Sequence, residues 1–322
     1  GRDCHGKPGC AMIEPTSDEP PRILVIRGGA IGDFILTLPV LAALRERFPQ
    51  ADIEVLGYPR IASLALSGGL AKAVHALESP GLAAFFARGG SSDLEWRDFF
   101  GQFAIVISYL YDPDGIFETN VKSCGPGQFI AAPHRPDEAK SIHASDVFLK
   151  PLERLTIFDG DPVARLELSG LPKRENTLAL HPGSGSPEKN WPERNWHDLL
   201  IHLLDHSPLE FLLVGGEAEG DLVRNLAKGT PAGRVQVAQH IPLHELASRL
   251  ANCSGYIGHD TGVTHLASAL ALPTLVLWGP SNETVWRPLG EKVRVLNQHS
   301  ALAELTLETV VEGINTLELE KF

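Results

Sequence analysis

Short apolar runs alternate with amphipathic stretches along most of the chain. The first run lies within Arg22–Arg27, where four consecutive apolar residues are typical of a strand buried on both faces of a parallel sheet. Phe34–Phe48 follows with apolar residues at helical spacing. Strands that alternate with helices in this way predict a parallel sheet and an α/β fold.

The same alternation continues through the first half of the chain. The expected strands are Asp52–Gly57, Ala73–Leu77, Phe103–Ser108 and Gln128–Ala131, and the expected helical segments are Arg60–Ser67, Gly81–Arg88, Leu94–Phe100 and Ile142–Leu155. Tyr109–Lys140 is rich in proline, glycine and charge, so we expect long loops there that line a cleft.

A second alternating series begins after the polar stretch Leu168–Asn176. Its expected strands are Thr177–His181, Phe211–Val214, Arg234–Ala238, one ending at Ile257, and Thr274–Trp278; its expected helices are Glu193–His206, Glu217–Lys228, Pro242–Ala251, one beginning near Val263, and Leu305–Leu317. The sequence therefore predicts two Rossmann-like domains, each with a doubly wound parallel sheet. The predicted divisions are a leader (1–21), a first domain (22–168), a second domain (169–304) and a C-terminal helix (305–322).

Composition narrows the class of protein. With 43% hydrophobic and 21% charged residues among 322, the chain is typical of a soluble globular protein. Its net charge of -12 argues against a nucleic-acid partner, and the lack of a long apolar run argues against a membrane span. Met12 is the sole methionine, so we expect native translation to begin there. The four cysteines form no CxxC pair, which indicates a reducing compartment and no zinc site.

The turn after the first strand carries an acid, Asp33. The surrounding glycines do not match the dinucleotide fingerprint GxGxxG, because Ala30 and Asp33 occupy the positions that it needs. A carboxylate in the first turn of a helix gains up to about 1 kcal/mol from the helix dipole, which is a purely structural role. At the carboxyl edge of a sheet it could equally act as a general base. Position alone leaves both roles open.

A second turn, Gly258–Gly262, joins a buried strand to a helix of small residues. The amides of Thr261, Gly262 and Val263 would then lie at the positive end of a helix dipole, where a phosphate binds readily. The structural alternative is that Asp260 or Thr261 simply caps the helix.

Two further features favour a nucleotide diphosphate. The loop after His181 offers the hydroxyls of Ser184 and Ser186 and the charge of Lys189, although it lacks a Walker pattern. Glu217 follows a strand, as expected of an acid that binds the hydroxyls of a ribose. Each feature alone is weak, and together they predict a site for ribose and two phosphates.

Other candidate residues have structural interpretations. Asp112-Pro-Asp114 and Asp159-Gly-Asp161 have the DxD spacing of some metal-binding transferases, but both are common turn sequences and we interpret them so. His265 is expected to be a packing residue, and Trp191 and Trp196 are expected in the core. No metal site is predicted.

Six motifs in order resemble those of the ADP-heptose:lipopolysaccharide heptosyltransferases, glycosyltransferase family 9. They are Ile31-Gly-Asp-x-x-x-Thr-x-Pro39, His181-Pro-Gly-Ser184, Lys189-x-Trp-Pro192, Val214-Gly-Gly-Glu217, Asp260-Thr-Gly-x-x-His265 and Trp278-Gly-Pro-Ser281. The resemblance implies a GT-B architecture, in which two Rossmann-like domains face a cleft. No acceptor-binding pattern can be matched within Tyr109–Lys140.

The resemblance also implies an activity. It implies inverting, metal-independent transfer of a sugar, heptose from ADP-heptose, to a lipopolysaccharide-core or related saccharide, lipid-linked or free. The enzyme would need no cofactor and would be cytoplasmic, with at most peripheral contact with the inner membrane. The implied roles are a base (Asp33), phosphate binding (Ser184, Ser186, Lys189, Asp260, Thr261, Gly262), ribose binding (Glu217) and support (Gly32, Thr37, His265).

Two other classes stay open on the same fold, because a fold does not fix a function. A nucleotide-sugar epimerase or hydrolase could use the same cleft. A non-catalytic nucleotide-binding homologue is the third possibility.

Overall fold

The structure is a computed structural model that describes residues 20–90, 93–168, 176–186, 189–216, 220–297, 301–317 and 319. The predictions made for the leader up to residue 19, for Met12 and for Glu217 lie outside these ranges. So does most of the polar stretch at the predicted domain boundary.

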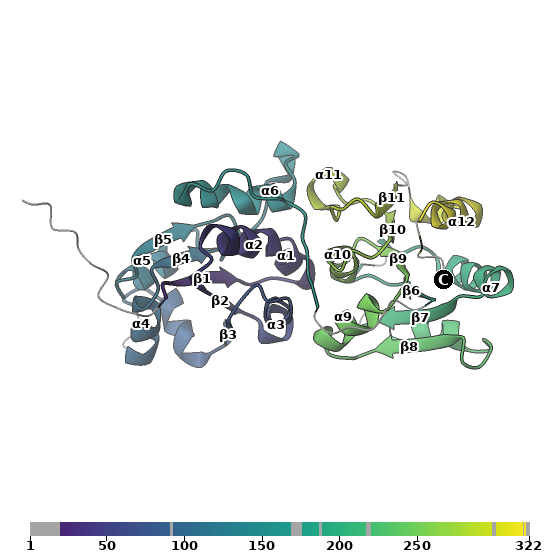
Figure 1. The fold of residues 1–322 in the computed structure, drawn as a ribbon, viewed down its shortest axis with the longest axis horizontal. Coiled ribbons are helices and arrows are strands. Elements are labelled where there is room, and N and C mark those ends of the chain that lie inside the picture. Colours follow the sequence, from purple (N-terminus) through teal and green to yellow (C-terminus); the bar gives the residue numbers. More distant parts are fainter. Residues whose placement is uncertain are drawn as a thin grey trace, which may run out of the picture.

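Two parallel sheets stand side by side (Figure 1). The first has the order β3-β2-β1-β4-β5, with β1 Arg22–Arg27, β2 Asp52–Gly57, β3 Ala73–Ala76, β4 Ile105–Ser108 and β5 Gln128–Ala131. The second has the order β11-β10-β9-β6-β7-β8, with β6 Thr177–His181, β7 Glu210–Gly215, β8 Val235–Gln239, β9 Gly255–His259, β10 Thr274–Trp278 and β11 Val293–Asn297. This confirms the predicted fold class, which is a pair of doubly wound α/β units.

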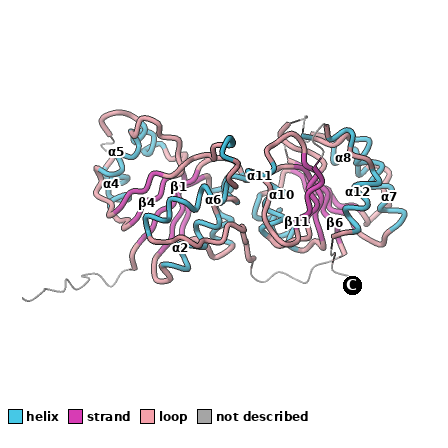
Figure 2. Tube along the Cα trace, turned by 90° about the horizontal axis from the view of Figure 1, so that it is seen from above, coloured by secondary structure: helices cyan, strands magenta, loops and turns pink. Residues whose placement is uncertain are grey.

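Helices cover both faces of each sheet (Figure 2). In the first half they are α1 Ile31–Ile35, α2 Leu38–Arg47, α3 Pro59–Ser67, α4 Leu94–Gly101, α5 Ile116–Lys122 and α6 Ala144–Leu149, with 3₁₀ turns η1 Pro80–Phe86, η2 Glu138–Lys140 and η3 Lys150–Leu155. In the second half they are α7 Glu193–His206, α8 Leu222–Ala227, α9 Leu243–Ala251, α10 Gly262–Ala269, α11 Glu283–Trp286 and α12 Leu307–Asn315, with η5 Leu302–Glu304.

The central strands are apolar because both of their faces are covered. All residues of β1 after Arg22 are buried, and β9 and β10 are buried throughout. The predicted core residues Trp191 and Trp196 are both buried, with ring centroids 5.5 Å apart. Each sheet has a cluster of buried apolar residues on one face, and a further cluster continues from the first half into the second.

Two predicted helices are broken where a proline intervenes. The segment Phe34–Phe48 is divided between α1 and α2, since Pro39 has no amide to donate to the carbonyl four residues earlier. The predicted helix Ile142–Leu155 likewise passes from α6 into the 3₁₀ turn η3, which contains Pro151. The predicted helix Gly81–Arg88 is also a 3₁₀ turn, η1.

Strand β11 was not predicted. It lies at the edge of the second sheet, pairs with β10 alone, and has one buried residue, Val293. An edge strand exposed on one side lacks the apolar run that marks the central strands.

The two halves meet where α1 packs against α10. A Cβ atom on Gly262 would lie 2.7 Å from Cβ of Ile31 and 2.9 Å from the amide nitrogen of Gly32, so no side chain fits there. Because α1 follows β1 and α10 follows β9, the carboxyl ends of the two sheets face each other. The contact continues at His143, whose Nδ1 accepts from the Ser145 amide and whose Nε2 therefore donates to the carbonyl of Arg287, 2.8 Å away.

We predict that Gly262→Ala destabilises the protein by about 1–3 kcal/mol, because the added methyl group overlaps α1. Thermal unfolding followed by calorimetry measures this. The matched control is Gly32→Ala on the opposite side of the contact, whose added methyl would meet its nearest atoms at 3.5 and 3.7 Å, ordinary contact distances. Equal melting temperatures for the two variants would contradict the close approach.

Candidate active site

A cavity of about 400 Å³ lies between the two halves, at the facing ends of the sheets. The first half lines it with Ala30, Gly32, Asp33, Leu36, Arg135 and Glu138, and the second half lines it with Lys189, Asp260, Thr261, Gly262, His265, Ser281, Asn282 and Trp286. Several of the predicted site residues are therefore brought together from segments more than 200 residues apart.

Asp33 enters the cavity from the first turn of α1. Its Oδ2 accepts a hydrogen bond of 2.9 Å from the amide of Ala30, the residue that precedes the helix. Asp33 therefore has the structural role that the sequence suggested, that of a carboxylate at the amino end of a helix. The side chain is still 32% exposed, so the carboxylate can also accept a proton from a bound molecule.

Arg27 lies behind Asp33 and is almost completely buried, with 2% of its side chain exposed. Its guanidinium donates to the carbonyls of His134 (2.9 Å) and Asp33 (3.3 and 3.4 Å) and lies 3.6 Å from Oδ1 of Asp33. It also lies over the ring of Phe148, 4.4 Å from the centroid. Burial lowers the pKa of Arg27, and the negative charge of Asp33 opposes this shift.

Arg27 was not predicted from the sequence as a site residue. The available signal was a cation that ends an apolar strand just before the Asp33 turn. Buried cations are costly unless they are paired and hydrogen-bonded, so a cation at the end of a buried strand indicates a nearby acidic partner.

The second half presents the amino end of α10. Thr261 is its N-cap, and Oγ1 of Thr261 accepts from the amide of Thr264 at 3.3 Å. The capping role is therefore confirmed for Thr261. The amides of Gly262 and Val263 follow it in the first turn, where no intrahelical acceptor exists. They find no acceptor elsewhere in the described part of the chain, so they are available to an anion.

Lys189 is held beside this turn by an ion pair. Its Nζ donates to Oδ2 of Asp260 at 2.7 Å, and its side chain is 34% exposed. The pair offsets the negative charge of Asp260 at a place where that charge would otherwise repel a phosphate. The ammonium keeps two further hydrogens for a ligand.

Buried histidines support the loop that carries Lys189. His259 is fully buried; its Nε2 accepts from the amide of Trp191 at 2.9 Å, and its Nδ1 lies 3.3 Å from the carbonyl of Gly183. Nδ1 therefore carries the proton, and His259 ties both ends of the loop to β9. His181 lies 3.3 Å from Oγ1 of Thr261. These histidines position the loop and the turn.

His265 is a buried residue that nevertheless lines the cavity. Burial lowers its pKa to about 4, and the nearby Asp260 and Asp33 only partly oppose this. The imidazole is therefore uncharged at neutral pH and contributes no positive charge to the site.

Other predicted residues lie outside the cavity lining. Oγ of Ser184 donates to the carbonyl of Ser186 at 2.7 Å and accepts from the amide of Ser186 at 3.2 Å, so this hydroxyl shapes its own loop. Oγ1 of Thr37 is buried and donates to the carbonyl of Asp33 at 2.8 Å. Asp112 accepts from the amides of Phe117 and Glu118, which agrees with the predicted turn.

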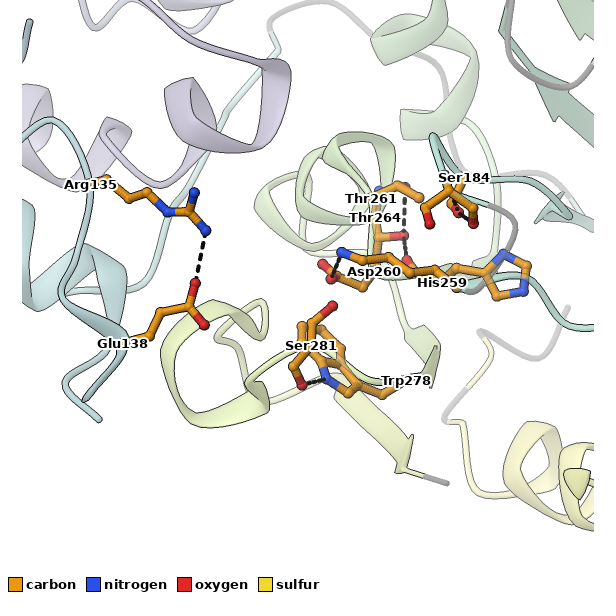
Figure 3. Close-up of polar contacts among 11 residues, drawn as sticks. Arg135, Glu138, Ser184, His259, Asp260, Thr261, Thr264, Trp278 and Ser281 are labelled. Atoms are coloured by element: carbon orange, nitrogen blue, oxygen red, sulfur yellow. Dashed lines mark hydrogen bonds and ion pairs between the residues drawn. The ribbon is translucent and has the colours of Figure 1, made fainter. Parts of the chain in front are cut away.

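Glu138 and Trp286 line the cavity and were not identified from the sequence. Arg135 could meet an anionic acceptor according to the sequence, which nevertheless favoured a solvated surface for it, and it also lines the cavity. Arg135 and Glu138 form an ion pair of 2.8 Å on the far wall, opposite Asp260 and Thr261 (Figure 3). The guanidinium of Arg135 also lies 5.5 Å from the ring centroid of Trp286. Both charged residues come from Tyr109–Lys140, which was expected to form long loops along a cleft. Their place on the cavity wall agrees with the expected cleft, but the stretch also contains helix α5 Ile116–Lys122, which was not expected there.

The described residues contain neither a metal-binding cluster nor a membrane-spanning helix. No three His, Cys, Asp or Glu side chains of that set gather closely enough to hold a metal ion. No helix within it has both the length and the hydrophobicity needed to cross a membrane.

Comparison with known families decides the class of protein. The profile of glycosyltransferase family 9 (heptosyltransferase) matches residues 154–314, which is half of the chain. The chain belongs to glycosyltransferase family 9.

Individual relatives of this family 9 chain are distant. It is 24% identical over 189 residues to lipopolysaccharide heptosyltransferase 2 of Escherichia coli (strain K12). This aligned region covers 52% of this chain and 54% of that protein. The chain thus spans about half the length of that curated relative.

Two solved structures show the same fold. One is a glycosyl transferase of family 9 from Veillonella parvula, with a TM-score of 0.76, 19% identity, and coverage of 96% of this chain and 100% of that one. The other is E. coli heptosyltransferase WaaC with ADP-2-deoxy-2-fluoro heptose, with a TM-score of 0.72, 20% identity, and coverage of 91% and 99%. The family 9 chain therefore has the GT-B fold.

We predict that Arg27→Met destabilises this family 9 protein strongly. It removes the hydrogen bonds from Arg27 to the carbonyls of His134 and Asp33, although Oγ1 of Thr37 still donates to Asp33. A carbonyl that is left without a donor away from water costs about 1–3 kcal/mol. Urea unfolding measures the loss.

The matched control is Arg22→Met at the other end of β1. Arg22 is also paired with an acid, Glu54 at 2.7 Å, and also lies over a ring, that of Phe103 at 4.5 Å, but it is more exposed and lies at the opposite end of the strand. Equal destabilisation by the two changes would show that the hydrogen bonds of Arg27 add nothing.

Proposed function

We propose that the protein is an inverting, metal-independent glycosyltransferase that moves a sugar from a nucleotide diphosphate donor to a saccharide acceptor. The observation that carries the proposal is the composition of the central cavity. A partly exposed carboxylate, Asp33, enters from one half, and Lys189 and the amino end of α10, with Thr261 and Gly262, line the cavity from the other.

The donor diphosphate would lie on the second half. Its oxygens would accept from the amides of Gly262 and Val263 and from the ammonium of Lys189, and the dipole of α10 would favour the negative charge. Glu217 would bind the ribose, in keeping with its place after β7. Ser184 and Ser186 would act by shaping the loop before Lys189.

The acceptor would approach from the first half. Its hydroxyl oxygen attacks the anomeric carbon of the donor, and Asp33 takes the hydroxyl proton. As the new bond forms, the bond between the anomeric carbon and the diphosphate oxygen breaks, and the electron pair leaves with the diphosphate. Attack from the side opposite the leaving group inverts the anomeric configuration.

The charge changes in this step fit the charges in the cavity. The transition state has positive character at the sugar ring and growing negative charge on the diphosphate. Lys189 and the amides of α10 lie where the negative charge grows, and groups that are already oriented stabilise such charge most effectively. These groups can supply this stabilisation without a metal ion.

The donor is proposed to be ADP-heptose. Support comes from the E. coli structure of the same fold, which holds an ADP-heptose analogue, and from the family to which the chain belongs. The acceptor would be a lipopolysaccharide core or related saccharide, with at most peripheral contact of the enzyme with the inner membrane. We also assign the base to a first domain (22–168) and the donor to a second (169–304), closed by the C-terminal helix (305–322).

A donor screen followed by a product assay tests this function. ADP-, UDP- and GDP-sugars are compared by thermal shift, because a ligand at 100 times its dissociation constant adds about 2.7 kcal/mol of stability. The donor that binds is then incubated with and without saccharide acceptors. Free sugar or an epimer formed without any acceptor would identify a hydrolase or epimerase instead.

We predict that Asp33→Asn lowers kcat for transfer by about 10²–10⁴-fold, because the amide cannot take the acceptor proton. The affinity for ADP should change little, since Asp33 lies on the opposite half. The control is Glu95→Gln, which removes an acid from the first turn of α4, remote from the cavity. Transfer by Asp33→Asn at a near-normal rate would disprove the role of the base.

We predict that Lys189→Ala weakens ADP binding by about tenfold or more, since it removes a charged hydrogen bond and leaves Asp260 without its counterion. Isothermal titration calorimetry measures the affinity. Lys150→Ala is the control, because Lys150 also pairs with a carboxylate at 2.7 Å, that of Glu153, but on the surface. An unchanged affinity in Lys189→Ala would place the diphosphate elsewhere.

A further inference from the structure

A second cavity, of about 240 Å³, opens at the carboxyl ends of β4 and β5. Residues that follow β4 form one wall, with Tyr111 and Asp112, and residues that follow β5 form the other, with Pro133 and His134. In open parallel sheets, ligands bind at the carboxyl ends of the strands. This cavity therefore lies at the ligand-binding edge of the first sheet, next to the strand that leads to Asp33.

The cavity presents an aromatic platform. Tyr111 is 69% exposed, and its ring packs edge to face against the ring of His134 with centroids 4.7 Å apart. A flat ring with an electron-rich face and a hydroxyl at its edge can contact the C–H face of a sugar and hydrogen-bond to its hydroxyls.

The carboxylates that line the cavity disfavour an anionic ligand. Among the described residues that line the cavity, Asp112 and Glu118 are charged, and none is a lysine or arginine. Asp112 is fixed by the amides of Phe117 and Glu118, at 3.2 and 2.9 Å, so it cannot turn away. Carboxylates accept hydrogen bonds from hydroxyl groups and repel other anions. The cavity therefore suits an uncharged sugar better than a phosphorylated or carboxylated one.

Hydrogen bonds from Arg27 connect the wall of this cavity to Asp33, the proposed base. The buried guanidinium of Arg27 donates to the carbonyl of His134, in the cavity wall, and to the carbonyl of Asp33. The next residue along the chain, Arg135, lines the central cavity. One short loop thus borders both cavities, and a saccharide that crosses it would reach from Tyr111 towards Asp33.

We propose that the cavity beside Tyr111 is a subsite for one uncharged sugar ring of the acceptor, with its C–H face on the ring of Tyr111. The proposal rests on the proposed transferase function and adds where the acceptor binds and which sugars it selects. The ring would be held so that a hydroxyl of the acceptor reaches Asp33.

The test measures binding without turnover. Methyl α-mannopyranoside and methyl α-glucopyranoside are examined by saturation-transfer difference NMR with the full chain and ADP, and methyl α-glucuronide serves as the charged analogue. The variants are Tyr111→Ala, Tyr111→Phe and the control Phe158→Ala. Phe158 is an equally exposed aromatic residue, at 73%, that lines neither cavity.

The proposal expects signals at the ring C–H protons of a neutral glycoside and about tenfold weaker binding by Tyr111→Ala, with Tyr111→Phe and Phe158→Ala close to wild type. The charged glucuronide should bind more weakly. No binding of either neutral glycoside, equal binding of the glucuronide, or unchanged binding by Tyr111→Ala would each overturn it.

A transfer assay separates this subsite from the function on which it rests. If transfer occurs, Tyr111→Ala should raise the acceptor KM about tenfold and leave ADP affinity unchanged. If wild type binds the neutral glycoside through Tyr111 yet transfers no sugar, the transferase proposal fails and the saccharide site stands. If transfer occurs with an unchanged acceptor KM in Tyr111→Ala, the subsite fails and the transferase proposal stands.

Discussion

The close contact between the amino ends of α1 and α10 is the constraint on which the rest of the site depends. Gly262 permits it, because any larger residue would collide with Ile31 and the backbone of Gly32. Both helices begin just beyond buried central strands, so their positions are set by the two sheets. The contact fixes the distance between a carboxylate from one half and a phosphate-binding turn from the other.

The charged groups of the site are already paired in the protein alone. Asp33 is held by the amide of Ala30 and backed by the buried Arg27, and Lys189 is held by Asp260. His265 stays uncharged because burial lowers its pKa. Groups fixed in this way need little reorganisation when a ligand arrives, which is the condition for strong electrostatic stabilisation of a transition state.

The loop after β5 connects the two cavities of the molecule. His134 lines one cavity and Arg135 lines the other, and Arg27 holds the loop against the backbone of the α1 turn. A substrate that occupies both cavities would contact one continuous strip of backbone. The position of the substrate relative to Asp33 would then depend on the buried side chain of Arg27, which the substrate does not contact.

Features that depend on neighbouring residues could be predicted from the sequence. Apolar runs such as that in Arg22–Arg27 predicted the buried strands, and the spacing in the turn after Ile257 predicted the capped amino end of α10. The edge strand β11 was missed because a half-exposed strand has a weak pattern. Local periodicity reports whether a segment is buried and does not report its partner.

Only the tertiary structure decided which residues meet. Lys189 pairs with Asp260, 71 positions along the chain, and Arg27 binds the carbonyl of His134, 107 positions away. Trp286 was not recognised, and a solvated surface was favoured for Arg135, because nothing near them in the sequence distinguishes them from surface residues. The physical reason is that such contacts arise when the two sheets and their helices pack against each other, which brings distant loop residues together without any repeating local signal.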